Sequence, residues 1–185
     1  AVHYMNNDPC RRFTFSVTIE NTQMRLWYYS RSHSVVSTPF NFVEDTKSFI
    51  HFVLAFAFAS PAALGYDPTV RRYYCDESRN FFYVFEIVQD EIKHYFRTID
   101  ILSEYRAARV SGRGTRVFLV QRCSGFNDTE PFGDKAVLKD FWLDERALPE
   151  WTIQADIFHQ LLSLVSTGGY KKYFMTILEH SQVQL

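Results

Sequence analysis

Residues 11–20 read RRFTFSVTIE, and apolar side chains occupy every second position from Phe13 to Ile19. A period of two is the pattern of a β-strand with one buried face. An Asn-Thr turn at residues 21 and 22 follows, and residues 24–30 (MRLWYYS) then predict the return strand of a hairpin. The chain is therefore expected to begin with an antiparallel sheet.

The same reasoning extends along the rest of the chain. Further strands are predicted at residues 34–37, 80–89, 94–105, 116–122, 136–143 and 173–178. One helix is expected from Asp45 or Thr46 to Ser60, and an amphipathic helix over residues 149–165. Loops are predicted at residues 65–69, 107–115 and 124–134, where turn formers gather. The fold class expected is α+β with mostly antiparallel strands.

Composition narrows the class of protein. The chain has 185 residues, 46% of them hydrophobic and 22% charged, as in soluble globular domains. Aromatic residues make up 17%, which predicts a large core rich in strands. The net charge of -1 gives no support to binding of nucleic acid or of an anionic membrane.

Cysteine usage and hydropathy indicate an intracellular protein. Cys10, Cys75 and Cys123 are odd in number and far apart, so we expect neither a disulfide framework nor a thiolate zinc site. The longest apolar run, at residues 52–59, is far short of the ~20 residues that a membrane span needs. No secretory signal is recognisable, so a cytoplasmic or nuclear location is expected.

Most enzyme motifs are absent from the sequence. It contains no H-E-x-x-H, no G-x-S-x-G and no G-x-x-x-x-G-K-[ST]. Its six histidines never fall at the spacing of metal ligands, so no metal site is predicted.

One group of residues has the pattern of a nucleotide site. Residues 112–116 (GRGTR) lie between two predicted strands, Lys139 lies on a later strand, and an acidic helix follows. Glycine lets the backbone approach phosphates closely, and a strand lysine can reach their oxygens as a point charge. A carboxylate of the helix would then hold the lysine by pairing with it. This order favours the nucleotide-binding half of a protein kinase.

Strand alternation places Val137 and Lys139 on one face. In the kinase interpretation, Val137 would lie over the adenine and Lys139 would meet the phosphates. Val117 occupies the slot of the third glycine in G-x-G-x-x-G. The predicted nucleotide-binding residues are Gly112, Arg113, Gly114, Thr115, Val117, Val137 and Lys139.

Longer stretches resemble the fungal-type protein kinase family. They are residues 11–45, 49–70, 111–118 (SGRGTRVF), 137–143 (VLKDFWL) and 170–178 (YKKYFMTIL). The resemblance runs from about Arg11 to about Leu178. It implies a strand-rich region followed by a kinase-like fold, and ATP-dependent phosphoryl transfer to protein hydroxyls with Mg²⁺ as the metal.

The resemblance also implies residue roles. Gly112 and Gly114 match the family's phosphate loop, and Lys139 matches the lysine of the third kinase strand. Asp156 stands where a glutamate is usual in the following helix, and Glu150 is the alternative carboxylate.

The residues after Lys139 depart from the kinase pattern. None of them spells H-R-D or D-F-G, and Asp140-Phe141-Trp142 is no D-F-G because it directly follows the lysine on one strand and lacks the glycine. We therefore expect an accessory region at residues 1–97 and a kinase-like small lobe at 98–185, without a catalytic lobe and inactive in isolation. Expected partners are ATP, a protein substrate, and the catalytic lobe or another protein on the face that this lobe would cover.

Two other functions stay open at this stage. The chain could be a non-catalytic interaction module, marked by an apolar patch around the helix that begins near Pro149. Alternatively, a basic edge could bind phosphate or nucleic acid through the arginines at 106, 109, 113, 116 and 122. The near-neutral net charge counts against that second alternative, and neither a nucleic acid nor a membrane is expected as a partner.

Overall fold

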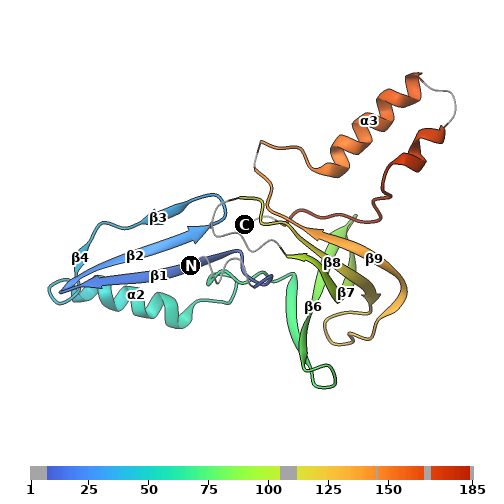
Figure 1. Cartoon of the computed structure of the whole chain (residues 1–185). Helices are drawn as coiled ribbons and strands as arrows, with labels where there is room; N and C mark the ends of the chain where they lie inside the picture. The colour runs from blue at the N-terminus through green and yellow to red at the C-terminus, as the bar shows by residue number, and fades with distance from the viewer. Residues whose placement is uncertain (1–7, 105–111, 145, 165–167, 184–185) are drawn as a thin grey trace.

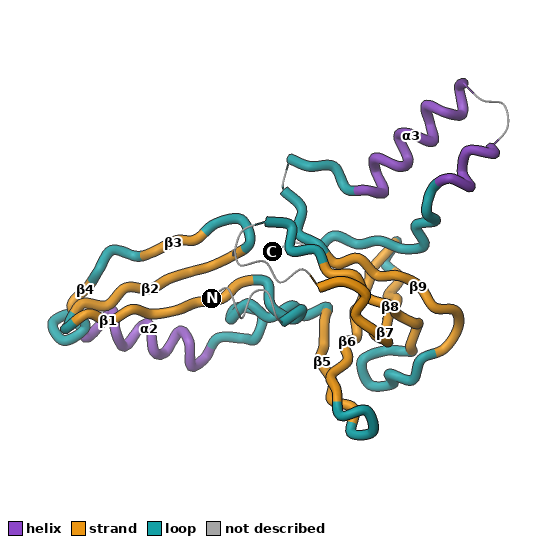
Figure 2. The backbone as a smooth tube through the Cα atoms, viewed as in Figure 1, coloured by secondary structure: helices purple, strands orange, loops and turns teal. Residues whose placement is uncertain are grey.

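The computed structural model describes residues 8–104, 112–144, 146–164 and 168–183 of the chain. Within these residues it contains two antiparallel sheets and two α-helices, so the predicted α+β class is confirmed. Figures 1 and 2 show the two sheets side by side, with the ends of the first sheet's strands facing the second. Within the described residues, no helix is long and apolar enough to span a membrane.

The first sheet is built around the predicted hairpin. Strands β1 (Phe13–Glu20) and β2 (Gln23–Ser30) pair over their whole length, and β2 also pairs with β3 (Ser34–Val36) and β4 (Phe40–Asn41). Asn21 takes the positive φ of 54° that this tight turn requires. The strand period of two was therefore a sufficient signal here.

Helix α2 (Thr46–Phe58) covers one face of the first sheet (Figure 1). Asp45 caps it, since its Oδ1 accepts a hydrogen bond from the Ser48 amide at 3.1 Å. Phe56 meets Phe15 of β1 edge to face, with ring centroids 5.2 Å apart. Met24 of β2 is 1% exposed on the same sheet.

The second sheet has the order β5-β6-β7-β8-β9, with every pair antiparallel. Its strands are β5 (Val70–Cys75), β6 (Asn80–Gln89), β7 (Ile92–Glu104), β8 (Arg116–Cys123) and β9 (Phe132–Asp140). One face carries a hydrophobic core cluster, which contains Cys10, Val70, Phe85, Phe96, Phe118 and Val120. Cys10 precedes the first sheet in the chain, so the N-terminal segment completes the core of the second sheet.

Strands β5 and β9 differ most from the prediction. Strand β5 was missed because its two arginines remain in solvent on an edge strand that pairs with β6. Strand β9 was predicted at residues 136–143. It begins at Phe132 through pairing with Arg122, and it ends at Asp140, whose partner Arg116 is the first residue of β8.

The strand predicted at residues 173–178 is wrong. A 3-10 helix, η1 (Gly168–Tyr173), occupies its start, and the residues after it form no ladder with either sheet. This segment runs along α3 (Glu150–Leu164) instead, where the carbonyl of Met175 accepts a hydrogen bond from Gln154 Nε2 at 2.9 Å. Phe174 packs edge to face on Phe158 of the helix.

The division predicted between residues 97 and 98 does not coincide with a boundary between the sheets. Both residues lie inside β7, which is a central strand of the second sheet. The chain passes from one sheet to the other between the end of α2 and Val70. Helix α3 stands away from the end of the second sheet (Figures 1 and 2).

Candidate functional site

The face of β8 and β9 opposite the core carries the predicted nucleotide-binding side chains. Val117 lies directly across from Lys139, and Leu119 across from Val137, so all four share one face. The intervening residues Phe118 and Leu138 point to the core, as alternation requires. Val137 is 62% exposed, so this face offers an open apolar surface next to a lysine.

Lys139 forms an ion pair with Glu150, the first residue of α3. The lysine Nζ donates to Glu150 Oε1 and also lies 5.1 Å from the ring centroid of Phe141. Asp156, the partner preferred from the sequence, lies on the same helix about 9 Å further along its axis, and its side chain is exposed. The structure therefore brings Lys139 together with Glu150, the alternative carboxylate, and not with Asp156.

The glycine turn before β8 is described from Gly112 to Thr115. Gly112 has a φ of 123° and Gly114 a φ of 50°, values that other residues rarely adopt. A Cβ at Gly112 would meet none of the described residues within 4 Å, so the backbone there is open to a ligand. Arg113 is exposed, and its carbonyl accepts a hydrogen bond from the Trp142 amide at 2.8 Å, which ties the turn to the end of β9.

An ion pair between a buried arginine and a partly exposed aspartate lies on the core side of this turn. Arg116, 3% exposed, holds Asp140 at 3.2 Å. Burial raises the pKa of Asp140 above its usual value of 3.8, although the charge of Arg116 acts to lower it. A second arginine, Arg31 of the first sheet, is 4% exposed and contacts the same turn.

Arg31 is a candidate functional residue that sequence reasoning missed. It lies in the turn between β2 and β3, 81 positions before Gly112, whose amide donates to the Arg31 carbonyl at 3.3 Å. No local pattern marks a contact across such a separation, and only the meeting of the two sheets reveals it.

These residues fit a nucleotide better than a metal ion. An open glycine turn, an exposed lysine held by a glutamate, and an exposed valine can receive phosphates and an adenine ring. Among the described residues, no group of three or more His, Cys, Asp or Glu side chains could hold a metal ion.

The arginines of the predicted basic edge do not form one exposed row. Arg106 and Arg109 lie outside the described residues. Arg116 is buried against Asp140, and Arg122 pairs with Glu179. A buried, paired guanidinium is not available to nucleic-acid phosphates.

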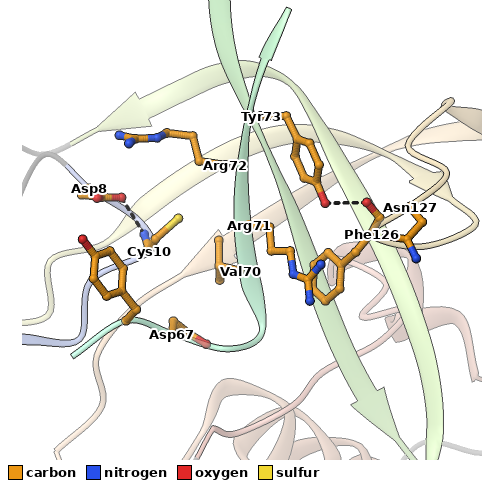
Figure 3. Close-up of a pocket in the computed structure, with 10 residues that line it drawn as sticks. Asp8, Cys10, Asp67, Val70, Arg71, Arg72, Tyr73, Phe126 and Asn127 are labelled. Carbon is orange, nitrogen blue, oxygen red and sulfur yellow. Dashed lines mark hydrogen bonds between the residues drawn. The ribbon is translucent and has the colours of Figure 1, made fainter. Parts of the chain in front are cut away.

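An open cavity of about 410 Å³ lies elsewhere, beside β5 (Figure 3). Both signs of charge line it, since Asp8, Asp67, Arg71 and Arg72 are among its lining residues. Tyr73 closes one end by donating to the Phe126 carbonyl at 2.5 Å, and Arg71 stacks on the Phe126 ring. None of the predicted nucleotide-binding residues is among the residues that line it.

Comparison with known proteins concerns both sheets and the candidate site together. No curated protein and no solved structure matches the chain. The family model described as fungal protein kinase matches residues 1–167, which include both sheets, the glycine turn, Lys139 and the whole of α3. The chain therefore belongs to the fungal protein kinase family.

Proposed function

We propose that this chain supplies the ATP-binding small lobe of a kinase that transfers phosphate from ATP to protein hydroxyls. The observation that carries the proposal is the Lys139–Glu150 ion pair, placed at the edge of an open apolar face and next to a glycine turn. A lysine on a strand, paired with a glutamate of the next helix, is the arrangement that kinases require to hold ATP phosphates.

Each residue has a separate part in binding. The backbone at Gly112 and Gly114 approaches the phosphates, and Lys139 places its positive charge on their oxygens. Glu150 keeps the flexible lysine side chain directed toward them. Val117 and Val137 supply the apolar surface for the adenine ring.

Binding of ATP to the 185-residue chain tests the proposal directly. Isothermal titration with ATP should show saturable binding at one site, and substitution of Lys139 by Met should weaken it. Absence of binding to the folded chain would contradict the proposal.

Phosphoryl transfer is expected to need residues that these 185 do not contain. The sequence has no H-R-D segment for the catalytic base and no D-F-G segment for the metal-binding aspartate. The chain should therefore bind ATP without autophosphorylation or ATP hydrolysis, as measured with labelled ATP. Turnover by this chain would show that no second lobe is needed.

A longer natural form that supplies those segments would test the lysine in catalysis. There, Lys139→Met should abolish phosphoryl transfer and spare the fold. Unchanged transfer would remove Lys139 from the site.

A second candidate function, a protein-interaction module, rests on apolar side chains around α3. Leu162, Tyr173, Met175 and Leu178 are between 64% and 83% exposed. Exposed apolar residues gathered in one region mark contact surfaces. Sedimentation of the chain should show association that a Met175→Glu, Leu178→Glu double variant abolishes. A strictly monomeric chain that does not bind a hydrophobic dye would remove the basis for this candidate.

A further inference from the structure

Arg31 lies beneath the glycine turn although it belongs to the other sheet. Its carbonyl accepts the hydrogen bond from Gly112 at 3.3 Å, and its side chain extends under Gly114. The residue is 4% exposed, so its guanidinium is enclosed by protein rather than by solvent. One residue of the first sheet thus contacts both glycines of the turn.

A glycine at position 114 suits both its φ of 50° and its close contact with Arg31. A Cβ at this position would lie 2.6 Å from both Cζ and Nη1 of Arg31, far inside van der Waals contact. Gly112 differs, because a Cβ there would meet no atom of the part of the chain that the structure describes within 4 Å. The two glycines therefore have different roles. Gly112 leaves the backbone open to a ligand, and Gly114 lets the turn pack against the guanidinium of Arg31.

Charge joins Arg31 to the strand that carries the lysine. Asp140 follows Lys139 in the chain, pairs with Arg116 and attracts Arg31. Burial and the nearby positive charge of Arg116 lower the pKa of Arg31, and Asp140 opposes that effect. The cluster therefore links the β2–β3 turn, the start of β8 and the end of β9.

We propose that Arg31 is a positioning residue for the nucleotide: it holds the glycine turn in the position at which the backbone of the turn can bind the phosphates. The first sheet is then part of the nucleotide site and not a separate accessory unit. This inference rests on the proposed ATP binding. The inference goes beyond ATP binding because Arg31 acts through Gly112 and Gly114 without touching the nucleotide.

The first test separates the phosphates from the adenosine. ATP and adenosine are titrated into the wild-type chain and into Arg31→Met, at a temperature where circular dichroism shows each protein to be folded. A misplaced turn loses preorganisation toward phosphates, so the affinity for ATP should fall roughly tenfold while that for adenosine changes less than about twofold. Arg31→Lys keeps the positive charge and should recover part of the loss.

Arg12→Met is the matched control. Arg12 also joins distant parts of the chain, through an ion pair with Asp67 at 2.8 Å with both side chains mostly buried. That ion pair joins the start of the first sheet to the loop before β5, so its loss should lower stability without changing the ratio of ATP to adenosine affinity. An equal change of that ratio in Arg12→Met would mean that Arg31 has only a structural role.

A double-mutant cycle tests the contact itself. Gly114→Ala forces a methyl group against the guanidinium, so it should weaken ATP binding more in the wild-type background than in Arg31→Ala. Gly112→Ala has no such contact, and its effect should be the same in both backgrounds. Equal effects of Gly114→Ala in both backgrounds would overturn the proposal.

Hydrogen exchange gives a measure that does not depend on ATP. The amides of residues 112–115 should exchange faster in Arg31→Met than in the wild type without nucleotide, because the turn has lost its support. Unchanged exchange would overturn the inference. If the wild-type chain bound no ATP, the proposed function would fail, and faster exchange would still show that Arg31 holds the turn.

Discussion

Lys139 and Glu150 form an ion pair that is largely open to solvent, since their side chains are 39% and 49% exposed. An exposed pair contributes little to the free energy of unfolding, because water screens the charges and both side chains lose freedom. The pair is therefore better understood as a device that orients the lysine than as a stabilising contact.

Lys139→Met is expected to change the unfolding midpoint little and to lower the affinity for ATP roughly tenfold, a loss of about 1.4 kcal/mol. Lys93→Met is the control, because Lys93 forms a similar pair with Glu86 at 3.1 Å on a different part of the sheet. Urea unfolding and ATP titration of both variants give the comparison. An affinity that falls as much in Lys93→Met as in Lys139→Met would contradict the assignment.

Gly65 is the most confined glycine of the described residues. Its φ is 95°, and a Cβ there would lie 2.1 Å from the carbonyl oxygen of Phe13. Gly65→Ala should therefore destabilise the chain by about 2 kcal/mol or more, because backbone has to move. Gly125→Ala, which meets nothing within 4 Å, should stay within about 0.5 kcal/mol in the same urea titration.

The three cysteines should differ in reactivity. Burial raises the pKa of Cys10 from 9.0 to about 12 and also raises that of Cys123, whereas hydrogen bonding with Ser78 lowers the pKa of Cys75. Since the thiolate is the nucleophile, iodoacetamide should modify Cys75 first and the other two only after unfolding. Peptide mass spectrometry measures the order, and early modification of Cys10 would contradict it.

The raised pKa of Cys10 also gives stability a pH dependence. The unfolded thiol loses its proton near pH 9.0, but the folded one retains it until about pH 12. The folded state binds more protons across this window, so stability falls as the pH rises through it. Cys10→Ala should remove that part of the alkaline slope in urea titrations.

At the scale of elements, periodicity predicted most strands and both helices. Strands whose side chains alternate between core and solvent, such as β1 and β8, were found within one or two residues of their ends. Edge strands were harder to predict: β5 exposes Arg71 and Arg72, and the end of β9 depends on where β8 begins. The extents of these edge strands are determined by pairing partners that lie far away in the chain.

Some features of the candidate site could also be predicted from local sequence patterns, whereas others depend on distant parts of the chain. Alternation alone placed Val137 and Lys139 on one face, and the register of β8 with β9 adds Val117. The choice between Asp156 and Glu150 depends on where α3 starts relative to β9, which no local pattern states. Arg31 depends on the contact of two sheets and was not predicted.

Helix α2 offers a prediction about its own start. Asp45 accepts a hydrogen bond from the Ser48 amide, and hydrogen bonding with Ser48 lowers the pKa of Asp45 below 3.8. A lowered carboxyl pKa stabilises the folded state fully above the unfolded value and less as the pH falls through the folded one. Asp45→Ala should therefore be less stable than wild type at neutral pH, and the two should converge in acid.

Asp45→Asn is the control for the cap, because its side-chain oxygen can still accept the hydrogen bond. Thermal unfolding of the three proteins across the acid range measures the difference. A gap between wild type and Asp45→Ala that persists below the pKa of Asp45 would show that the carboxylate charge contributes nothing.

At the scale of the whole molecule, several contacts join the two sheets. Cys10 belongs to the core of the second sheet, Arg11 forms a β-bridge with Tyr66, and Gly112 donates to Arg31. In the first sheet, the side chain of Met24 is buried, at 1% exposed. Two sheets joined by these contacts are expected to unfold together rather than one after the other.

Met24→Ala tests that coupling. It removes most of a buried side chain from the first sheet and should cost about 2–5 kcal/mol. Because the sheets share contacts, amides of β7 and β8 in the second sheet should lose as much global protection in hydrogen exchange as those of β1 and β2. Loss of protection confined to the first sheet would show that the sheets unfold independently, and would weaken the argument that Arg31 transmits the position of one sheet to the glycine turn of the other.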